Sequence, residues 1–442
     1  MKMNRRKFLR TSSGLFVSAA ITGIWSCKRI TAKKQKYNFE PFKGESLAPV
    51  LKVTPDDGYY VHTYFDVTPF SPTQRYLAVS RLPFQDRIPK LGDTASVCVI
   101  DLHSETIETV YTTKAWGFQT GTNVQWGASD RYVYTNDFID GKAVAVQIDL
   151  ESDNVTIFDT SMYHVAFDGS SMIGFPLKYL NVTQQGYGLP SSDNTSPIKL
   201  PIGAATDEGI WRIDLHTGKI RLLYSLADVA AKIPEPPPEK NGTYYFWHSK
   251  FNRQGTRIMQ VLRCLFPGGW GGRNPMVFTL NSDGSNVKFT KNFPVWGCSL
   301  GGHPNWHPDG EHIIRNMKPY GEDTYLCQMK FDGSDFKILS EKFKSSGHPS
   351  IHPDNQYIMT DRWTRDDGRQ KISLILFDQI ADESVTITTM PTIDRQGLTG
   401  IRKTLRLDGH PVWSRDYKRV SFQAAVDGNR QLFIIDLSKI IG

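Results

Sequence analysis

The chain has 442 residues, of which 39% are hydrophobic and 22% are charged, so its composition is neither that of a disordered protein nor that of a fibrous one. It contains 52 Lys and Arg against 45 Asp and Glu, but five of the basic residues lie in residues 1–26, which contain no acidic residue, and the remainder carries a net charge of only +2. This small excess argues against nucleic acid as a partner.

The N-terminus is typical of an export signal. Arg5 and Arg6, followed by a weakly apolar run from Leu15 to Trp25, resemble a twin-arginine signal, and the run is too short to stay in a bilayer as a spanning helix. Residues 24–27 then resemble an imperfect lipobox that would make Cys27 the lipidated residue; otherwise Cys27 is cleaved away or packed. We therefore expect a signal over 1–27, a linker over 28–45, and a protein located in the periplasm or anchored by lipid at the cell envelope.

From residue 46 onward, short apolar runs alternate with Asp-Gly, Asn-Gly and Ser-Pro turn signals, which is typical of an all-β protein. Two independent repeats each occur seven times: a strand-and-turn unit, and a strand that often ends in Ile-Asp-Leu. The strand-and-turn units begin at Val67, Asn123, His164, His248, His303, His348 and His410. Because a four-stranded blade takes about 40 to 50 residues, these repeats predict one seven-bladed β-propeller domain over residues 46–442.

The last predicted blade ends at Gly442, just after its third strand. We expect an N-terminal strand, at Pro49–Thr54, to add to the outside of this blade and close the ring, because closure removes the exposed edges of an open sheet. The closed ring is expected to be a monomer.

Strand direction alternates within a blade, so the loops into the first strand and the loops between the second and third strands lie on one face. The second-to-third-strand segments are long and rich in Arg, Tyr and Gly, so we expect the chemistry on that face. The five segments are residues 81–90, 177–201, 263–274, 316–323 and 361–369.

Five of the 11 histidines occupy the same position at the start of the first strand, beside the central channel. Three of them, His303, His348 and His410, lie in Gly-His-Pro triplets of consecutive blades, and neighbouring imidazoles suit a divalent ion such as zinc or manganese, with calcium left open. Cys298 could add a ligand. The alternative is that Gly-His-Pro is a structural blade-entry motif. His307 and His352, nearer the opposite face, are expected to be turn residues.

The chain resembles the β-propeller polysaccharide lyases, a group that includes oligogalacturonate lyase and ulvan lyases. The resemblance is carried by the seven-blade layout, the Gly-His-Pro triplets, His62-Thr-Tyr-Phe-Asp before blade 1, Gly186-Tyr187-Gly188 and Trp247-His248. The metal site of oligogalacturonate lyase resembles a Gln-x-x-His-x-His run, which this chain lacks. The resemblance therefore implies a uronate-containing polymer other than pectin fragments.

β-Elimination at a uronic acid, which the resemblance implies, needs a base, a proton donor for the leaving oxygen, and a cation that stabilises the carboxylate. We assign His248 as the base with His164 as the second candidate, Tyr187 as the proton donor, and Arg263 as the carboxylate-binding residue. Further substrate contacts are expected from His62, Tyr64, Arg81, Asn123, Arg273 and Arg362.

Two alternatives stay open. A propeller without activity that binds a glycan or a protein would lack a converging set of His, Tyr and Arg. A hydrolase would need two facing carboxylates, which Asp66, Asp137, Asp361 and Glu322 could supply. If the protein is a lyase, its expected partner is an acidic polysaccharide or oligosaccharide.

Overall fold

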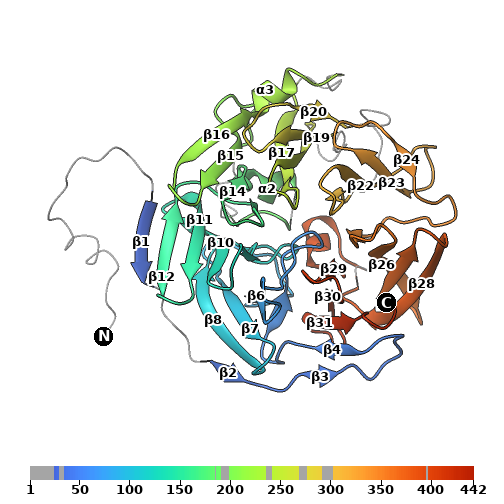
Figure 1. Ribbon diagram of the computed structural model, residues 1–442. Coiled ribbons are helices and arrows are strands. Elements are labelled where there is room, and N and C mark those ends of the chain that lie inside the picture. Colours follow the sequence, from blue (N-terminus) through green and yellow to red (C-terminus); the bar gives the residue numbers. More distant parts are fainter. Residues whose placement is uncertain are drawn as a thin grey trace, which may run out of the picture.

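The computed structural model describes residues 24–28, 34–184, 186–190, 199–234, 241–267, 276–290, 302–394 and 397–442. These residues form seven antiparallel sheets arranged as blades around a central axis (Figure 1). The predicted all-β fold with seven blades is therefore confirmed. Cys298 and Arg273 lie outside the described residues.

Each blade is built from strands in chain order, from the channel outward. Blade 1 contains β5 (Tyr59–Val61), β6 (Tyr76–Leu82), β7 (Ala95–Asp101) and β8 (Thr106–Thr113). Blade 2 contains β9 (Gln125–Trp126), β10 (Tyr132–Ile139), β11 (Lys142–Asp149) and β12 (Asn154–Phe158). Blade 3 contains β13 (His164–Val165), β14 (Ser171–Gly174), β15 (Gly209–Asp214) and β16 (Ile220–Ser225).

The second half of the ring follows the same order. Blade 4 contains β17 (Thr243–Phe251), β18 (Arg257–Leu265), β19 (Met276–Asn281) and β20 (Lys288–Phe289). Blade 5 contains β21 (Asn305–Trp306), β22 (His312–Met317), β23 (Tyr325–Lys330) and β24 (Lys337–Ile338). Blade 6 contains β25 (Ser350–Ile351), β26 (Tyr357–Asp366), β27 (Arg369–Asp378) and β28 (Glu383–Pro391), and blade 7 contains β29 (Val412–Trp413), β30 (Arg419–Ala424) and β31 (Gln431–Asp436).

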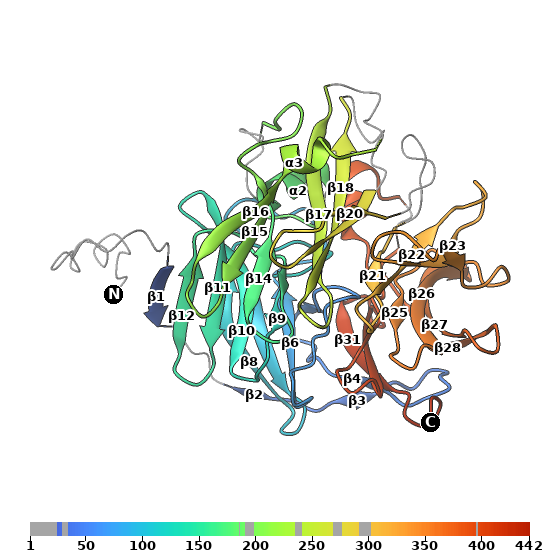
Figure 2. The same ribbon diagram turned by 45° about the horizontal axis from the view of Figure 1, so that its top comes forward.

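The described helices are short and lie in connections between strands: α2 (Leu177–Thr183), α3 (Leu226–Ala230) and the 3-10 helix η1 (Gly400–Leu405). In Figure 2, α2 and α3 lie toward the top of the picture, whereas β2 and β3 lie toward the bottom. Within the described part of the chain, no helix has the length and hydropathy needed to cross a membrane.

The repeated aromatic residue of the strand-and-turn unit links neighbouring blades. The indole N–H of Trp306 donates to the Lys250 carbonyl of the preceding blade, at 3.1 Å. Trp413 donates to the Ser350 carbonyl at 2.9 Å, and Trp126 to the Pro69 carbonyl at 2.8 Å. Each carbonyl lies two residues after the start of its own repeat unit, so the sequence repeat reappears as a repeated hydrogen bond between blades.

The Asp of the Ile-Asp-Leu strand ends the third strand of a blade and organises the turn that follows. Asp101 accepts the backbone N–H of His103 at 2.9 Å and pairs with the Arg75 guanidinium at 2.7 Å. Asp149 of blade 2 makes the equivalent ion pair with Arg131, also at 2.7 Å. These carboxylates cap the turns that follow them. The motif therefore recurs because the same turn follows the third strand of these blades.

An N-terminal strand takes the fourth position of blade 7. β4 (Val50–Lys52) pairs antiparallel with β31, with Val50 opposite Ile435 and Lys52 opposite Phe433. Figure 1 shows the N-terminal strands β3 and β4, in blue, lying beside β31, in red. Val50 packs in the apolar core between blades 6 and 7, which includes Phe422.

The structure differs from the predicted linker over 28–45, because parts of it form outer strands. β2 (Gln35–Lys36) pairs with β8 of blade 1, and β3 (Glu40–Pro41) pairs with β4. β1 (Ile24–Lys28) pairs with β12 and sets Cys27 opposite Val155. These strands cover sheet edges that would otherwise be open to other chains. The export signal and the lipidation of Cys27 stay predictions.

The first strand of blade 1 is interrupted, and the interruption enters the channel. β5 pairs with one end of β6, while Phe70 bridges Leu77 near the other end. Between them, residues 62–66, the His-Thr-Tyr-Phe-Asp motif, leave the sheet. The Tyr64 and Phe65 side chains are 1% and 0% exposed, so the motif fills the channel.

Blade 6 also differs from expectation. Residues 361–369 were expected to form a long loop, but β26 and β27 pair up to Asp366 and Arg369, which leaves only a two-residue turn at Asp367-Gly368. Both turn residues have positive φ, the conformation of a tight hairpin.

Candidate active site

Four of the seven residues that begin the repeat units share an unusual backbone. Asn123, His248, His303 and His410 have φ of 56°, 59°, 53° and 47°, in the left-handed region. Asn and His enter this region more often than most residues, and its cost is tolerated where the surroundings hold it. In blade 4 this conformation coincides with a β-bulge at His248.

The three Gly-His-Pro histidines converge around Tyr64. The imidazole centroids of His303 and His348 are 4.0 Å apart, and those of His348 and His410 are 4.4 Å apart. The Tyr64 ring lies 4.5 Å from the His410 ring and is stacked on His248 at 5.1 Å. The structure therefore brings together four histidines from four consecutive blades, as the repeat position predicts.

Each Gly-His-Pro imidazole is held through its Nδ1 atom. His303 Nδ1 lies 2.9 Å from the Gly347 carbonyl, His348 Nδ1 lies 2.9 Å from Asp361 Oδ1, and His410 Nδ1 lies 3.3 Å from the Gln423 amide. Contacts of this kind orient the ring of a metal-ligating histidine. At His303 and His348 an oxygen can accept the Nδ1 proton, which leaves the lone pair on Nε2. At His410 the Gln423 amide nitrogen donates to Nδ1, so a neutral ring carries its proton on Nε2, and binding a metal there requires that proton to leave.

Asp361 holds two of these histidines in position. Its carboxylate also accepts the backbone N–H groups of His348, Gly409 and His410 at 2.8–3.1 Å. Burial alone would raise the pKa of Asp361, but His348 and the backbone donors lower it below its usual value. Asp361 is therefore a charged, fully engaged residue that positions two histidines.

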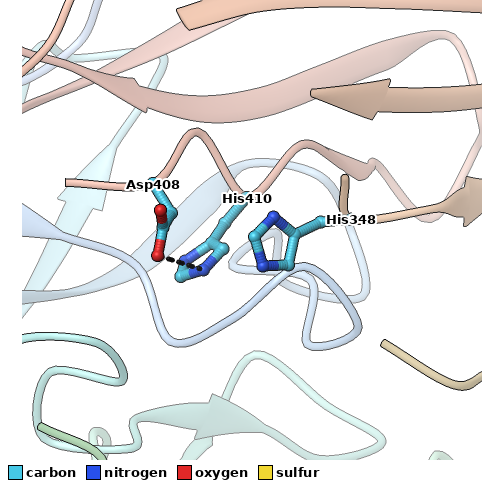
Figure 3. A group of neighbouring side chains, drawn as sticks. All are labelled: His348, Asp408 and His410. Carbon is cyan, nitrogen blue, oxygen red and sulfur yellow. Dashed lines mark ion pairs between the residues drawn. The ribbon is translucent and has the colours of Figure 1, made fainter. Parts of the chain in front are cut away.

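A metal-type cluster forms from His348, His410 and Asp408 (Figure 3), whose candidate ligand atoms all lie within 4.8 Å of one another. Asp408 Oδ2 is 3.9 Å from His410 Nε2, and that nitrogen is buried without a hydrogen-bond partner among the described residues. Two imidazoles and a carboxylate at this spacing meet the geometric requirement for a divalent-cation ligand set. Asp408, which is not among the predicted ligands, joins the predicted His348 and His410 in this group. His303 lies beside it, with its ring centroid 4.0 Å from that of His348, and Cys298 falls outside the described residues.

His248 lies next to this cluster and is held by a tyrosine. Its Nδ1 is 2.6 Å from the Tyr163 hydroxyl, and its ring stacks on Trp247 at 4.3 Å. Burial, assisted by the positive charges of Lys250 and Arg263, lowers the pKa of His248 well below its ordinary value. The imidazole is therefore neutral near pH 7, the state that a general base requires.

A cavity of about 210 Å³ opens beside His248. Its described lining includes Arg263, His303, Asn316 and Lys318, and contains no acidic residue. Arg263 is fixed by a 3.0 Å hydrogen bond to Gln184 and lies over the Trp247 ring at 4.4 Å. The predicted pairing of His248 and Arg263 on one face is therefore what the structure shows.

Tyr187 lies on the other side of Trp247, with ring centroids 4.5 Å apart, and does not line the cavity. Its hydroxyl accepts a 3.0 Å hydrogen bond from Arg406, whose Nε donates to Asp408 at 3.0 Å. Burial raises the pKa of Tyr187, and the Arg406 charge opposes that rise. Gly186, with φ of 90°, allows the turn that carries Tyr187 inward, as predicted.

Three predicted residues are buried in other roles. His62 is fully buried near His410, and burial lowers its pKa to about 3. The Asn123 amide donates to the Met162 and Tyr163 carbonyls at 3.2 Å, so it links blades 2 and 3. His164 is not part of the cluster: it lines a separate cavity with Phe167 and Phe251.

Two predicted arginines lie away from the cluster. Arg81 pairs with Asp57 at 3.3 Å on blade 1. Arg362 is exposed on β26 and donates to the Lys344 carbonyl at 2.8 Å. Both therefore contact their own blades and the loops beside them, and neither contacts the histidine cluster in the described structure. His307 and His352 are turn residues as predicted, each accepting the backbone N–H of the residue two positions later.

Sequence reasoning missed Tyr163, Arg406 and Asp408. Tyr163 precedes His164, and the repeat pattern singles out His164 alone. Asp408 lies two residues before His410, and this Asp-x-His spacing is the local signal for its place in the group. Arg406 has no local signal, since its partner Tyr187 is more than 200 residues away in the sequence.

The fold and this cluster define a seven-bladed propeller with a histidine-rich channel. No protein-family model matches the chain, and no curated protein sequence matches it. Among solved structures, it is similar to an oligogalacturonate lyase in complex with manganese, with a TM-score of 0.64 and 15% identity over 91% of this chain and 97% of the other. It is equally similar to the oligogalacturonate lyase of Vibrio parahaemolyticus, with a TM-score of 0.64 and 15% identity over 92% and 99% of the two chains. The predicted structural resemblance to this group is therefore confirmed at the level of fold.

Proposed function

We propose that the protein is a polysaccharide lyase that cleaves a uronic-acid-containing glycan by β-elimination. The observation that carries this proposal is the meeting of a neutral, oriented imidazole, His248, with the cation Arg263 at one cavity beside a metal-type cluster. The shared fold with oligogalacturonate lyases supports it.

His248 is the proposed base for the C5 proton. If its Nδ1–H donates to the Tyr163 oxygen, the Nε2 lone pair is free to accept a proton. Tyr163 then acts as a positioning residue that selects the tautomer. Burial keeps the ring uncharged before the reaction, so no proton has to leave it first.

Arg263 and Lys318 are the proposed partners of the substrate carboxylate. A guanidinium can bind a carboxylate through two parallel hydrogen bonds, and the Gln184 contact uses only part of its donor set. The absence of acidic residues from the described cavity lining favours an anionic sugar. As the proton leaves C5, negative charge grows on this carboxylate, so the same cations stabilise the transition state.

Tyr187 stays the proposed proton donor to the leaving oxygen, although it lies outside the cavity beside His248; its ring is 6.0 Å from that of Tyr64, which stacks on His248. Arg406 stabilises a phenolate at this position, because its guanidinium donates directly to the Tyr187 hydroxyl. Tyr64, stacked on His248, is the alternative donor.

His348, His410 and Asp408 would hold the metal ion. A set of two imidazoles and one carboxylate suits manganese or zinc better than calcium, which prefers oxygen ligands throughout. A bound divalent ion would supply additional positive charge for the uronate carboxylate.

Three of the four carboxylates named for a hydrolase are engaged elsewhere in the structure, and the fourth, Glu322, is exposed on the connection between β22 and β23. Asp66 pairs with Lys250, Asp361 is held by His348 and three backbone N–H groups, and Asp137 accepts from Tyr111 at 2.8 Å. Hydrolysis needs one carboxylic acid and one carboxylate on either side of the scissile bond. This commitment favours elimination.

The direct test is incubation with a panel of acidic polysaccharides containing galacturonate, glucuronate or iduronate, followed by ultraviolet absorbance. Elimination creates an unsaturated uronate that absorbs, whereas hydrolysis creates no conjugated double bond. Binding of a glycan with no absorbance change would favour the non-catalytic propeller. We also propose that the protein acts after export, in the periplasm or at the cell envelope, which cell fractionation tests.

A further inference from the structure

A second cavity, of about 120 Å³, lies in the channel apart from the cavity beside His248. Its lining includes His164, Thr68, Lys250, Arg253 and Arg415, together with aromatic side chains. Apart from Lys250, whose charge helps to keep His248 neutral, these residues have no role in the elimination as proposed with His248 as the base. Phe65 lies between the two regions: its ring is 5.1 Å from the His348 ring, and Lys250 Nζ lies 4.8 Å from its centroid.

His164 presents an unused donor to this cavity. The backbone N–H of Phe251 donates to His164 Nδ1 at 3.3 Å, so the neutral ring carries its proton on Nε2. Burial lowers the pKa of His164 to about 4, which keeps the ring neutral. The residue is only 5% exposed, and no partner of its Nε2 is found among the described residues.

Thr68 offers a second unused group. Its hydroxyl is buried in the cavity wall and makes no hydrogen bond to any described residue. A buried hydroxyl without a partner is unfavourable, and such groups commonly face a ligand or water.

Two guanidinium groups add positive charge without a matching carboxylate. Arg415 donates to the Phe70 and Gly127 carbonyls at 3.1 Å, and Arg253 donates to the Tyr417 hydroxyl. Neither arginine forms an ion pair with a described residue. Burial, and next the charge of Arg253, lower the pKa of Arg415 to about 10, which shows that the two cations act on each other.

The positive charge of Lys250, the remaining cation of this lining, is already neutralised. Lys250 is buried and forms an ion pair with Asp66, the one acidic residue of the described lining. The Asp66 oxygens accept no hydrogen bond from a described residue apart from this ion pair. The other unpartnered groups of the described lining, including the Thr68 hydroxyl and His307 Nε2, can donate. A planar or tetrahedral oxyanion accepts from several such donors at once.

We infer that this cavity is a binding site for a small oxyanion, a carboxylate or a phosphate, held by Arg253, Arg415, Thr68 and His164. The site is separate from the proposed catalytic one and does not depend on it.

The test is titration calorimetry of the purified protein with inorganic phosphate, and separately with acetate. We expect saturable binding of one equivalent of at least one probe, and the tighter probe identifies the oxyanion class. Arg253→Gln removes an exposed cation and should weaken binding at least about tenfold. Thr68→Val keeps the side-chain shape, should weaken binding, and should leave the melting temperature unchanged or raised because no protein hydrogen bond is lost.

Two matched variants separate this site from others. Arg221→Gln, at an exposed arginine on the outer strand β16, should bind like the wild type. Arg263→Gln tests whether the probe occupies the cavity beside His248 instead. Binding that is lost in Arg263→Gln but kept in Arg253→Gln and Thr68→Val would overturn the inference, as would the absence of saturable binding of both probes.

Discussion

Replacement of His248 by asparagine is the sharpest test of the proposed base. His248 has φ of 59°, and asparagine tolerates this conformation better than alanine does. The protein itself supplies the precedent, because Asn123 occupies the equivalent position of blade 2 with φ of 56°. His248→Asn should therefore fold normally while losing the imidazole.

The expected loss follows from the role assigned to the ring. General base catalysis is typically worth ~10² to 10⁴-fold, or roughly 3 to 5 kcal/mol of activation free energy. Because the base acts mainly as the proton leaves, turnover should fall by at least about 100-fold with little change in substrate affinity. Tyr163→Phe keeps the imidazole but removes the oxygen 2.6 Å from its Nδ1, so we expect a smaller loss and a changed pH profile.

The assay is the initial rate of ultraviolet absorbance increase on the uronate polymer that the panel identifies. Melting temperature and circular dichroism of each variant verify the fold. The assignment is refuted if folded His248→Asn retains more than about a tenth of wild-type turnover.

Four further predictions test the metal, the acid, the ring closure and a buried histidine. The purified protein should contain about one equivalent of divalent metal, which His348→Ala should lose and the turn variant His352→Ala should keep; metal retained by both would place the ion elsewhere. Tyr187→Phe, which deletes only a hydroxyl, should lower turnover at least ~100-fold; if more than about a tenth remains, Tyr64 becomes the candidate. Deletion of residues 46–56 removes β4 and should lower the melting temperature strongly, so an unchanged melting temperature would contradict closure by this strand. Burial lowers the pKa of His164 to about 4, so this side chain binds a proton more strongly in the unfolded chain than in the folded one. The free energy of unfolding should therefore fall as pH decreases from about 6.5 toward 4, and the contribution of His164 to this fall should be ~2 kcal/mol at pH 5. Urea unfolding at several pH values should show a steeper pH dependence for the wild type than for His164→Gln.

The number of blades could be predicted from the sequence because each blade repeats the same local requirements. An aromatic residue at the third position after the repeat start, as in Trp306, meets the carbonyl of the preceding blade. The Asp of Ile-Asp-Leu caps a turn within a few residues of itself, as Asp101 does. The positions of His303, His348 and His410 followed from the same register, because consecutive blades repeat by rotation around one axis.

The functional cluster was decided in part by contacts that no local pattern encodes. His164 shares the repeat position of His248, yet it lines a different cavity, and Tyr163 beside it contacts His248 instead. Tyr64 reaches the centre only because the first strand of blade 1 is interrupted and residues 62–66 fill the channel. The Arg406 guanidinium donates to the Tyr187 hydroxyl, although the two residues are 219 positions apart in the sequence. A repeat specifies which residues face the axis, because hydrogen-bond register within a blade is local. Which of those side chains touch depends on how seven blades and their unequal connections fill one shared interior, and only the tertiary structure determines that.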